Sequence, residues 1–293
     1  MRQTLTLRLI YLIVFVALSW PLIKKYSLPP AEMEQANKIY KLLDSFVLGE
    51  NGIAFVALDF GPSTIAENKP QAESLIEHLM RRHIHFALIT QYALASPFLE
   101  SIPQQVAQRL MRELPSERWE YGKDWVNLGF QPGGSLFLQS LAKAEDLTAF
   151  FKKDAKGTPL SEISAFHGVK TLKDVKLLGE FTGLTGMFSS YVQFFKTEDH
   201  TPVFIHGCTS ITIPDAYIYL DSGQLMGLFE GIAGAAWYSV LHTRAHPSRE
   251  QGDSLLVNTA LGVAHLVLLA LIVAGNVIYF YGQMKNKREA VSA

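Results

Sequence analysis

Asp59 is the first residue in the chain whose type and position suggest chemistry. It lies next to the end of the apolar run at 52–60, which is followed by a Gly-Pro-Ser sequence that ends at Ser63. A carboxylate at a strand end can hold a metal, contact a ribose or act as a nucleophile, but Asp, Gly, Pro and Ser also form turns. No second carboxylate lies close by in the sequence, so a turn is favoured, with Asp59 and Ser63 kept as candidate ligand contacts.

Further candidate positions follow later apolar runs. Gly133 and Gly134 come after the run at 124–130 and directly before a predicted helix. Exposed amides at a helix start can bind an anion, and Asn127 inside the run could also contact such a ligand. The sequence is neither a GxGxxG motif nor a Walker loop, so a tight turn, with Asn127 facing a helix, is favoured. Thr182, in the flexible loop after the next run, is another candidate.

Cys208 is the only cysteine of the chain, and His206 lies two residues before it. Alternate residues of a strand point the same way, so the thiol and the imidazole could act as nucleophile and base. A single thiol among apolar residues is more often inert, and this second interpretation is favoured. One cysteine also excludes an internal disulfide framework and a cysteine-based zinc cluster.

The nine histidines do not form a recognisable metal motif. The sequence has no HExxH motif and no Cys/His pair at zinc spacing, and His83 and His85 are expected at the polar exit of a helix. A GxSxG nucleophile elbow is absent as well. We therefore expect no metal and no cofactor, and a non-catalytic protein rather than an enzyme.

The elements that must position these residues alternate along the middle of the chain. Continuous apolar strands suit a sheet that is covered on both faces, and alternation with helices implies parallel pairing through right-handed crossovers. We predict an α/β fold with a Rossmann-like, doubly wound, mostly parallel five-stranded sheet. The expected strands are 52–60, 84–90, 124–130, 175–181 and 202–207. The expected helices lie within 26–46 and at 72–82, 97–114, 135–142, 187–195 and 214–243.

Two apolar stretches flank this domain. The stretch at 255–281 is uncharged, ends in an aromatic cluster and exceeds the roughly 20 residues that a membrane-spanning helix needs. The stretch at 9–23 is shorter. A cleaved signal peptide would also have a basic start and a short apolar run, but small residues suited to cleavage are lacking, so an uncleaved anchor is favoured. The predicted segments are a transmembrane anchor at 1–25, an α/β domain at 26–252, a second transmembrane helix at 253–282 and a basic tail at 283–293.

Positive residues lie at both ends of the chain, at Arg2 and Arg8 and again at Lys285, Lys287 and Arg288. Two spans place both tails on one side, and the positive-inside rule favours the cytoplasm. A long loop translocates largely regardless of its charge. We therefore expect a protein integral to the cytoplasmic membrane, with both termini cytoplasmic and the α/β domain extracytoplasmic.

Small and polar residues in the last third of the chain suggest assembly. One predicted helix carries an unusual density of glycine, which favours tight packing on the sheet or, alternatively, a subunit contact. Polar residues inside the second span are expected to face another helix, and an ion pathway is the other possibility. The glycines are Gly223, Gly227, Gly231 and Gly234, and the intramembrane polar residues are Asn258, His265 and Asn276.

Composition limits the function that these elements can serve. The 293 residues carry 26 Lys and Arg against 27 Asp and Glu, which excludes the basic surface of a general nucleic-acid binder. The sequence favours a membrane-anchored, non-catalytic α/β module for assembly or partner docking, with the bilayer and either a second copy or a membrane protein as partners. A small-molecule sensor with its pocket at the strand ends is the alternative, and a membrane-tethered hydrolase is the third.

Overall fold

The computed structural model describes residues 2–184, 186–196, 200–250 and 252–292. The chain forms two compact units. One combines Met1–Pro30 with Leu255–Ala293, and the other is Ala31–Ser254. The first unit holds the apolar helices and the second holds the α/β domain, so each is described separately.

The helical unit contains α1 (Arg2–Lys24) and α10 (Ser254–Ser292). Both are long and apolar enough to cross a membrane, over Thr6–Lys24 and Ser254–Met284. The Leu28 N–H donates to Thr259 Oγ1 at 2.9 Å within this unit. Of the polar residues predicted at membrane depth, Asn258 is half-buried and His265 is exposed, while Asn276 is exposed and donates to the Ile272 carbonyl of its own helix at 2.9 Å.

The domain is built on a parallel sheet of six strands, one more than the sequence predicted, in the order β3-β2-β1-β4-β5-β6. The chain therefore starts in the middle of the sheet, grows to one edge through β3, and returns to continue from β4 to the other edge. The strand order reverses between β1 and β4. The strands are β1 (Ile53–Asp59), β2 (Phe86–Thr90), β3 (Trp125–Phe130), β4 (Val175–Thr182), β5 (Val203–Cys208) and β6 (Gly227–Glu230).

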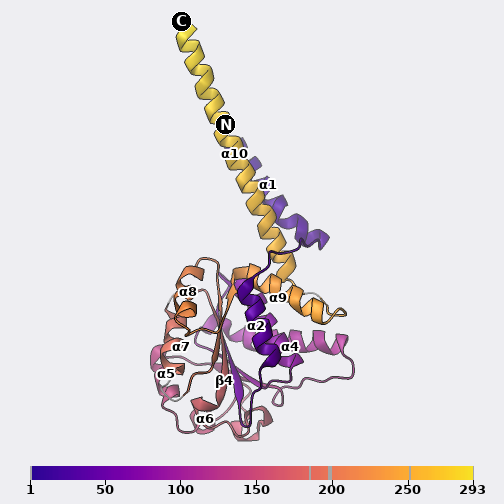
Figure 1. Cartoon of the computed structure of the whole chain (residues 1–293), viewed down its shortest axis with the longest axis vertical. Coiled ribbons are helices and arrows are strands. Elements are labelled where there is room, and N and C mark those ends of the chain that lie inside the picture. The colour runs from indigo at the N-terminus through magenta and orange to yellow at the C-terminus, as the bar shows by residue number, and fades with distance from the viewer. Residues whose placement is uncertain (1, 185, 197–199, 251, 293) are drawn as a thin grey trace. The chain divides into compact units, whose positions relative to one another are not determined.

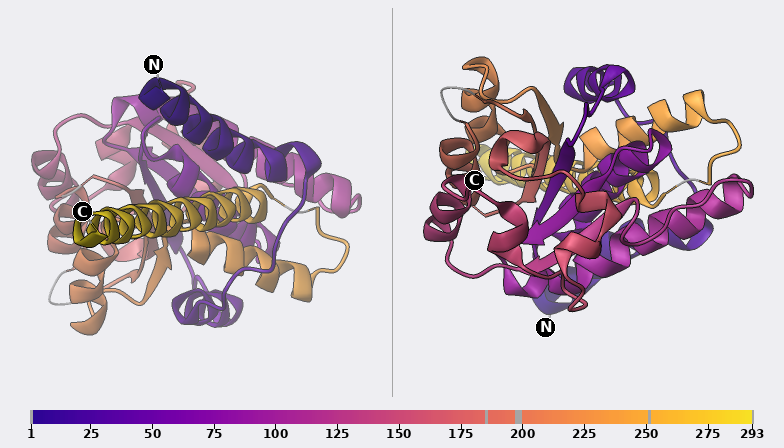
Figure 2. Two further views of the ribbon diagram at one scale, coloured as in Figure 1. Left: turned by 90° about the horizontal axis from the view of Figure 1, so that it is seen from above. Right: turned by 90° about the horizontal axis from the view of Figure 1, so that it is seen from below.

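Helices cover both faces of this sheet, as Figures 1 and 2 show. One layer contains α2 (Glu34–Ser45), α3 (Ile65–Arg81), α4 (Ser96–Glu113) and α9 (Gly231–Ala245). The other contains α5 (Ser135–Ala142), α6 (Leu147–Phe151), α7 (Met187–Phe195) and α8 (Ile213–Asp221). Double coverage explains the apolar strand sequences, since every residue of β1 is buried and successive side chains enter opposite layers.

A long connection joins β3 to β4, because the chain must cross from one edge of the sheet to its centre. Residues 143–174 contain α6 and three short 3-10 turns, at Leu160–Glu162, Ser164–Phe166 and Leu172–Asp174. Their apolar side chains, such as Phe166 and Val169, are buried with those of α5 and α7. A further 3-10 turn at Ala93–Ala95 leads from β2 into α4.

The helix predicted at 214–243 is wrong, because the structure divides this segment into α8, β6 and α9. The four glycines therefore do not share a helix. Gly223 lies in the turn after α8 with φ +71°, Gly227 begins β6, Gly231 begins α9 with φ +58°, and Gly234 lies within α9. A Cβ on Gly227 would collide with Ile39 of α2, so glycine allows α2 to pack directly on the edge strand.

Candidate functional site

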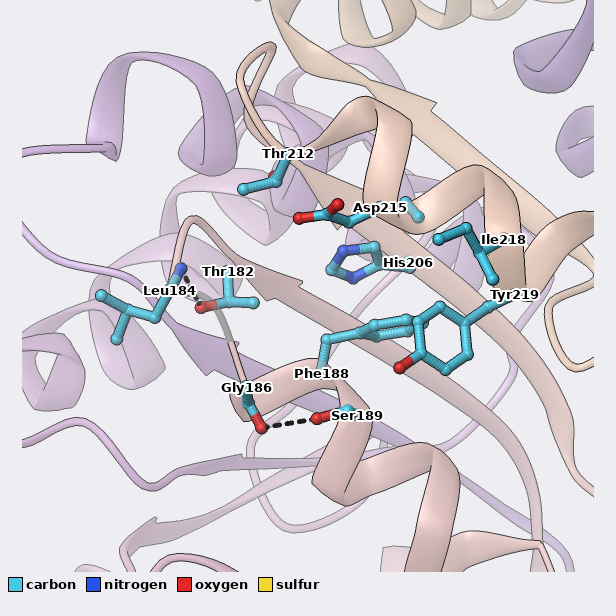
Figure 3. A pocket seen from close by; sticks show the side chains of 11 residues that line it. Thr182, Leu184, Gly186, Phe188, Ser189, His206, Thr212, Asp215, Ile218 and Tyr219 are labelled. Atoms are coloured by element: carbon cyan, nitrogen blue, oxygen red, sulfur yellow. Dashed lines mark hydrogen bonds between the residues drawn. The ribbon is translucent and has the colours of Figure 1, made fainter.

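A cavity of about 260 Å³ lies at the carboxyl ends of β4 and β5, between α7 and α8 (Figure 3). Ligands of open parallel sheets bind at this edge. Both strands are followed at once by loops that lead into helices, which leaves room between the two helix starts. The lining residues are Thr182, Leu184, Gly186, Phe188, Ser189, His206, Thr212, Asp215, Ala216, Ile218 and Tyr219.

His206 forms the floor of this pocket and is 3% exposed. Alternation along β5 directs its side chain to the layer of α7 and α8, where the ring stacks on Phe188 with 4.0 Å between ring centroids. Its Nδ1 lies 3.1 Å from the backbone carbonyl oxygen of Glu180. A carbonyl oxygen only accepts, so Nδ1 carries the proton and Nε2 is left as an acceptor. Burial lowers the pKa of His206 to about 3, so the ring is neutral at physiological pH.

Glu180, on the neighbouring strand β4, lies beside this ring and is fully buried. Its Oε2 is 2.7 Å from His206 Nδ1, but the N–H points to the backbone carbonyl instead, and neither carboxyl oxygen has a hydrogen-bond partner among the described residues. Burial raises the pKa of Glu180 well above its ordinary value and lowers that of His206. Both shifts disfavour a charged pair at this contact.

Four hydroxyl groups line the pocket walls, and three of them donate their proton to a backbone carbonyl. Thr182 Oγ1 donates to Asp59 O at 2.9 Å and also accepts from the Leu184 N–H at 3.0 Å. Ser189 Oγ donates to Gly186 O at 2.9 Å, and Thr212 Oγ1 donates to Thr209 O at 3.2 Å. These bonds fix the two loops and leave the oxygen lone pairs of these three groups for a ligand, while the fourth hydroxyl belongs to Tyr219.

Asp215 supplies the charge of the site from the first turn of α8. In Figure 3 its carboxylate lies on the same side of the cavity as the His206 ring. The side chain is exposed, and no hydrogen bond or ion pair involves it in the part of the chain that the structure describes. The apolar walls are formed by Phe188 and Tyr219, whose rings meet edge to face at 4.8 Å, together with Ile218 and Ala216.

Asp59 lies behind the pocket, at the end of β1, where it joins three strands. Its Oδ1 accepts from Thr90 Oγ1 at 2.9 Å and from the Gln91 N–H at 2.6 Å, and its backbone carbonyl accepts from Thr182. Burial, followed by the nearby Glu180 carboxyl, raises the pKa of Asp59 to about 7. The predicted turn therefore has a buried, protonatable acid at its start.

Buried polar side chains collect around Asp59 and Glu180. The Tyr191 hydroxyl interacts with the side chains of both Asp59 and Gln91, whereas the two Glu180 oxygens have no hydrogen-bond partner among the described residues. A buried polar atom without a partner costs about 1–3 kcal/mol. Asp59, Glu180 and Thr182 all point to the α7 side of the sheet, so the polar region is continuous with the pocket wall at Thr182.

The other predicted ligand contacts lie outside this site. Ser63 is exposed in the turn before α3, while Gly133 and Gly134 form a tight turn with φ +122° and +56°. Asn127 is buried in β3, where its Oδ1 accepts from the Gly129 N–H at 2.8 Å and supports a local irregularity of the strand. Of the seven predicted ligand contacts, Thr182 alone lines the pocket, and Asp59 adjoins it through a hydrogen bond.

The thiol of Cys208 is a buried core group. It packs against Ala216 and Leu228, and Sγ lies 3.5 Å from the Phe229 carbonyl oxygen. Burial raises the pKa of Cys208 to about 12, which keeps the thiol protonated. The structure thus places this thiol in the core and not in the pocket lining.

Bulky side chains occupy the point where the strand order reverses, next to the pocket. A Cβ on Gly61 would lie 2.5 Å from the Tyr92 ring, and one on Gly183 would lie 2.5 Å from Thr64 and 2.8 Å from Thr209. These neighbouring side chains fill the space between the loops that follow β1 and β4. The cavity therefore lies one strand further along the sheet, at the ends of β4 and β5.

Sequence reasoning missed Glu180, Thr212, Asp215, Phe188 and Tyr219. Glu180 is the only acidic residue inside the apolar run at 175–181, which was the one available signal. The others resemble ordinary helix residues. In the described ranges, no group of three or more His, Cys, Asp or Glu side chains is placed to hold a metal ion. Comparison with protein-family models and with curated protein sequences finds no match, so the interpretation of the site depends on its geometry.

Proposed function

We propose that this chain is a membrane-anchored receptor whose α/β domain binds a small organic molecule in the pocket between β4, β5, α7 and α8. One observation carries the proposal: an apolar cavity at the carboxyl ends of parallel strands has a buried histidine as its floor and two buried acid groups, Asp59 and Glu180, behind it. Pockets of this kind, apolar with a few convergent polar groups, are the usual sites of small ligands.

The energetic cost of the polar region supports this proposal. An apolar residue at position 180 would avoid burying an unpartnered carboxyl group next to His206. Proteins retain such costly groups mainly where they take part in function. We therefore infer that Glu180 and His206 are kept for the ligand rather than for stability.

We also propose that the domain is Rossmann-like. Its strand order, 3-2-1-4-5-6, is the one found in doubly wound dinucleotide-binding folds. The turn after β1 lacks the glycine pattern of those proteins, and its acid is buried rather than facing a ribose. The proposed ligand is therefore not a dinucleotide.

A substitution that fills the pocket tests the proposal. Ser189→Trp would place an indole at the cavity wall, whereas Gln193→Trp changes an exposed residue one turn further along α7 that does not line the cavity. A fragment library is screened by thermal shift on the full-length protein in detergent. Bound fragments stabilise the wild type and the Gln193→Trp variant by mass action, but not the Ser189→Trp variant. Equal shifts in all three proteins would contradict the proposal.

Assembly or partner docking is a second candidate function, and it is favoured by exposed aliphatic side chains at the same edge. Leu136 is 73% exposed, Leu184 37% and Ile211 89%, in the loops or first helical turns after β3, β4 and β5. Clustered exposed apolar groups mark interaction sites. The partner would be a second copy or another membrane protein. Crosslinking of the full chain in native membranes tests it, with Ile211→Asp expected to reduce any crosslinked species.

The membrane arrangement is proposed on the charge pattern of the sequence. Two spanning helices place both tails on one side, and the basic residues of the tails favour the cytoplasmic side. On this proposal the pocket faces the extracytoplasmic space and reports on molecules found there.

A further inference from the structure

We infer that the ligand of this pocket is a compact organic cation, an amine or guanidinium attached to an apolar or aromatic body. The inference rests on the proposed function and adds the chemical class of the ligand. It follows from which hydrogen-bonding groups the pocket leaves unused, from the charge of its lining, and from its size.

Most of the hydroxyl groups present acceptors. Thr182, Ser189 and Thr212 each have a single O–H, and each O–H is already used on a backbone carbonyl. The carbonyl of Gly186 cannot donate. The Tyr219 hydroxyl is the fourth in the lining and can donate or accept. A ligand rich in N–H groups therefore finds several acceptors on these walls.

The floor also presents an acceptor. The His206 Nδ1–H is used on the Glu180 carbonyl, which leaves the Nε2 lone pair. No hydrogen bond to Nε2 occurs among the described residues. An ammonium or guanidinium group can donate to this nitrogen while its body lies against the Phe188 ring on which His206 stacks.

The charge of the lining has one sign. Asp215 is the single charged side chain among the lining residues, which include no Lys and no Arg. The first turns of α7 and α8 lie at the pocket and their dipoles would attract an anion, but Asp215 sits in the first turn of α8 and opposes that attraction. The electron-rich faces of Phe188 and Tyr219 favour a cation as well.

The size of the cavity restricts the ligand. Its volume of about 260 Å³ is smaller than the roughly 300–1,000 Å³ of typical pockets for drug-sized molecules. A single ring or a short aliphatic chain with one cationic head fits this space. The geometry therefore points to a monoamine of this size rather than a large polycation.

Three probes with the same body and different heads test the inference: 2-phenylethylamine, 2-phenylethanol and 3-phenylpropionate. Each is titrated by calorimetry into the full-length protein in phosphatidylcholine nanodiscs, with protein-free nanodiscs as the blank for lipid partitioning. We expect the amine to bind at least about tenfold more tightly than the carboxylate, with the alcohol between them.

Two matched variants on α8 identify the carboxylate responsible. Asp215→Asn should weaken binding of the amine about three- to tenfold and leave the alcohol unchanged. Asp221→Asn removes the same charge from the exposed end of the same helix, outside the pocket, and should leave all three probes unaffected. Salt should weaken binding of the amine to the wild type more than to Asp215→Asn.

The alternative outcomes separate this inference from the proposed function. Tightest binding by the carboxylate, strengthened in Asp215→Asn, would overturn the cation assignment while supporting a ligand pocket. Equal binding of the amine to wild type and Asp215→Asn would also overturn it. If no probe binds above the blank, the inference fails, and the pocket itself is rejected only if the fragment screen with Ser189→Trp also shows no pocket-dependent shift.

Discussion

At the scale of single residues, the buried acids define what is unusual about this domain. Asp59 accepts two hydrogen bonds on Oδ1, while the oxygens of the nearby Glu180 have no hydrogen-bond partner among the described residues. The local hydrogen bonds favour the ionised form of Asp59, but burial and the neighbouring carboxyl group favour the neutral form and prevail, since its pKa rises to about 7. The result is a residue that changes charge near neutral pH inside the fold.

The raised pKa of Asp59 predicts that the stability of the fold decreases as the pH rises. The unfolded pKa of Asp59 is 3.8, so the folded protein binds more protons than the unfolded chain between about pH 4 and pH 7. Stability from this residue is therefore fully present below pH 4 and is lost as the pH rises through 7. Asp59→Asn keeps an acceptor for Thr90 and Gln91 and removes the charge. We expect the stability of Asp59→Asn relative to the wild type to rise by roughly 2–4 kcal/mol between pH 4 and pH 8.

The measurement is thermal unfolding of full-length wild type and Asp59→Asn in detergent between pH 4 and pH 8. Asp221→Asn, an exposed residue at the end of α8, is the control for loss of a carboxylate. A stability difference between wild type and Asp59→Asn that is constant across this pH range would show that Asp59 is ionised in the fold throughout.

At the scale of elements, one ion-pair network connects three segments of the domain. Glu77 of α3 is buried and contacts Arg81 at 2.8 Å, Arg109 of α4 at 2.8 Å and Arg249, in the segment after α9, at 2.6 Å. Arg81 also pairs with Glu113 at 2.7 Å. Burial alone would raise the pKa of Glu77, but its bonds with Arg249 and the other positive charges outweigh burial, so the pKa lies well below its ordinary value.

Glu77→Gln should therefore be strongly destabilising, because it leaves buried guanidinium groups without their countercharge. We expect a loss of about 3–5 kcal/mol at pH 7, measured by thermal or chemical unfolding in detergent. The folded pKa is depressed, so this contribution is present above the unfolded pKa of 4.5 and disappears as the pH falls below it. Glu34→Gln, which breaks the exposed pair with Lys38, should cost less than about 1 kcal/mol. Similar losses in both variants would contradict the network's role.

The edge strand β6 gives a second prediction at this scale. Gly227→Ala should destabilise the domain by about 1–3 kcal/mol, because the new Cβ would collide with Ile39 of α2. Ile39→Ala creates a cavity but removes the colliding atoms, so the double variant should lose less stability than the sum of the two single variants. If the losses in the same unfolding experiment are additive, the effect of Gly227→Ala arises within the strand itself and not from a collision with Ile39.

The same element shows where prediction from sequence succeeds and fails. The five strands β1 to β5 have long, buried, β-branched or aromatic runs, and their positions were predicted to within a few residues. By contrast, β6 is only Gly227–Glu230 and pairs with β5 alone, so Gly227 and the following Gly231 resembled a helix-packing pattern. Of the candidate site, Thr182 and the neighbouring Asp59 were predicted from their places at strand ends. Asp215 and Phe188 could not be, because only the fold brings the starts of α7 and α8 together.

At the scale of the whole molecule, the proposed membrane arrangement places the pocket on the extracytoplasmic side. The chain provides a suitable background for testing this by cysteine labelling. Its only cysteine, Cys208, is fully buried, and burial raises the pKa of the thiol to about 12, so the wild type should not react with a membrane-impermeant maleimide.

Two variants, each with one added cysteine, then report on which side of the membrane the domain and the tail lie. Glu145→Cys places a thiol at an exposed position of the domain, and a cysteine appended after Ala293 reports the basic tail. In cells with an intact cytoplasmic membrane, we expect the first to be labelled and the second to be labelled only after permeabilisation, because positive tails are retained in the cytoplasm. The reverse pattern would place the pocket in the cytoplasm. Labelling of both thiols in intact cells would mean that α10 does not cross the bilayer, because the domain and the tail would then lie on the same outer side.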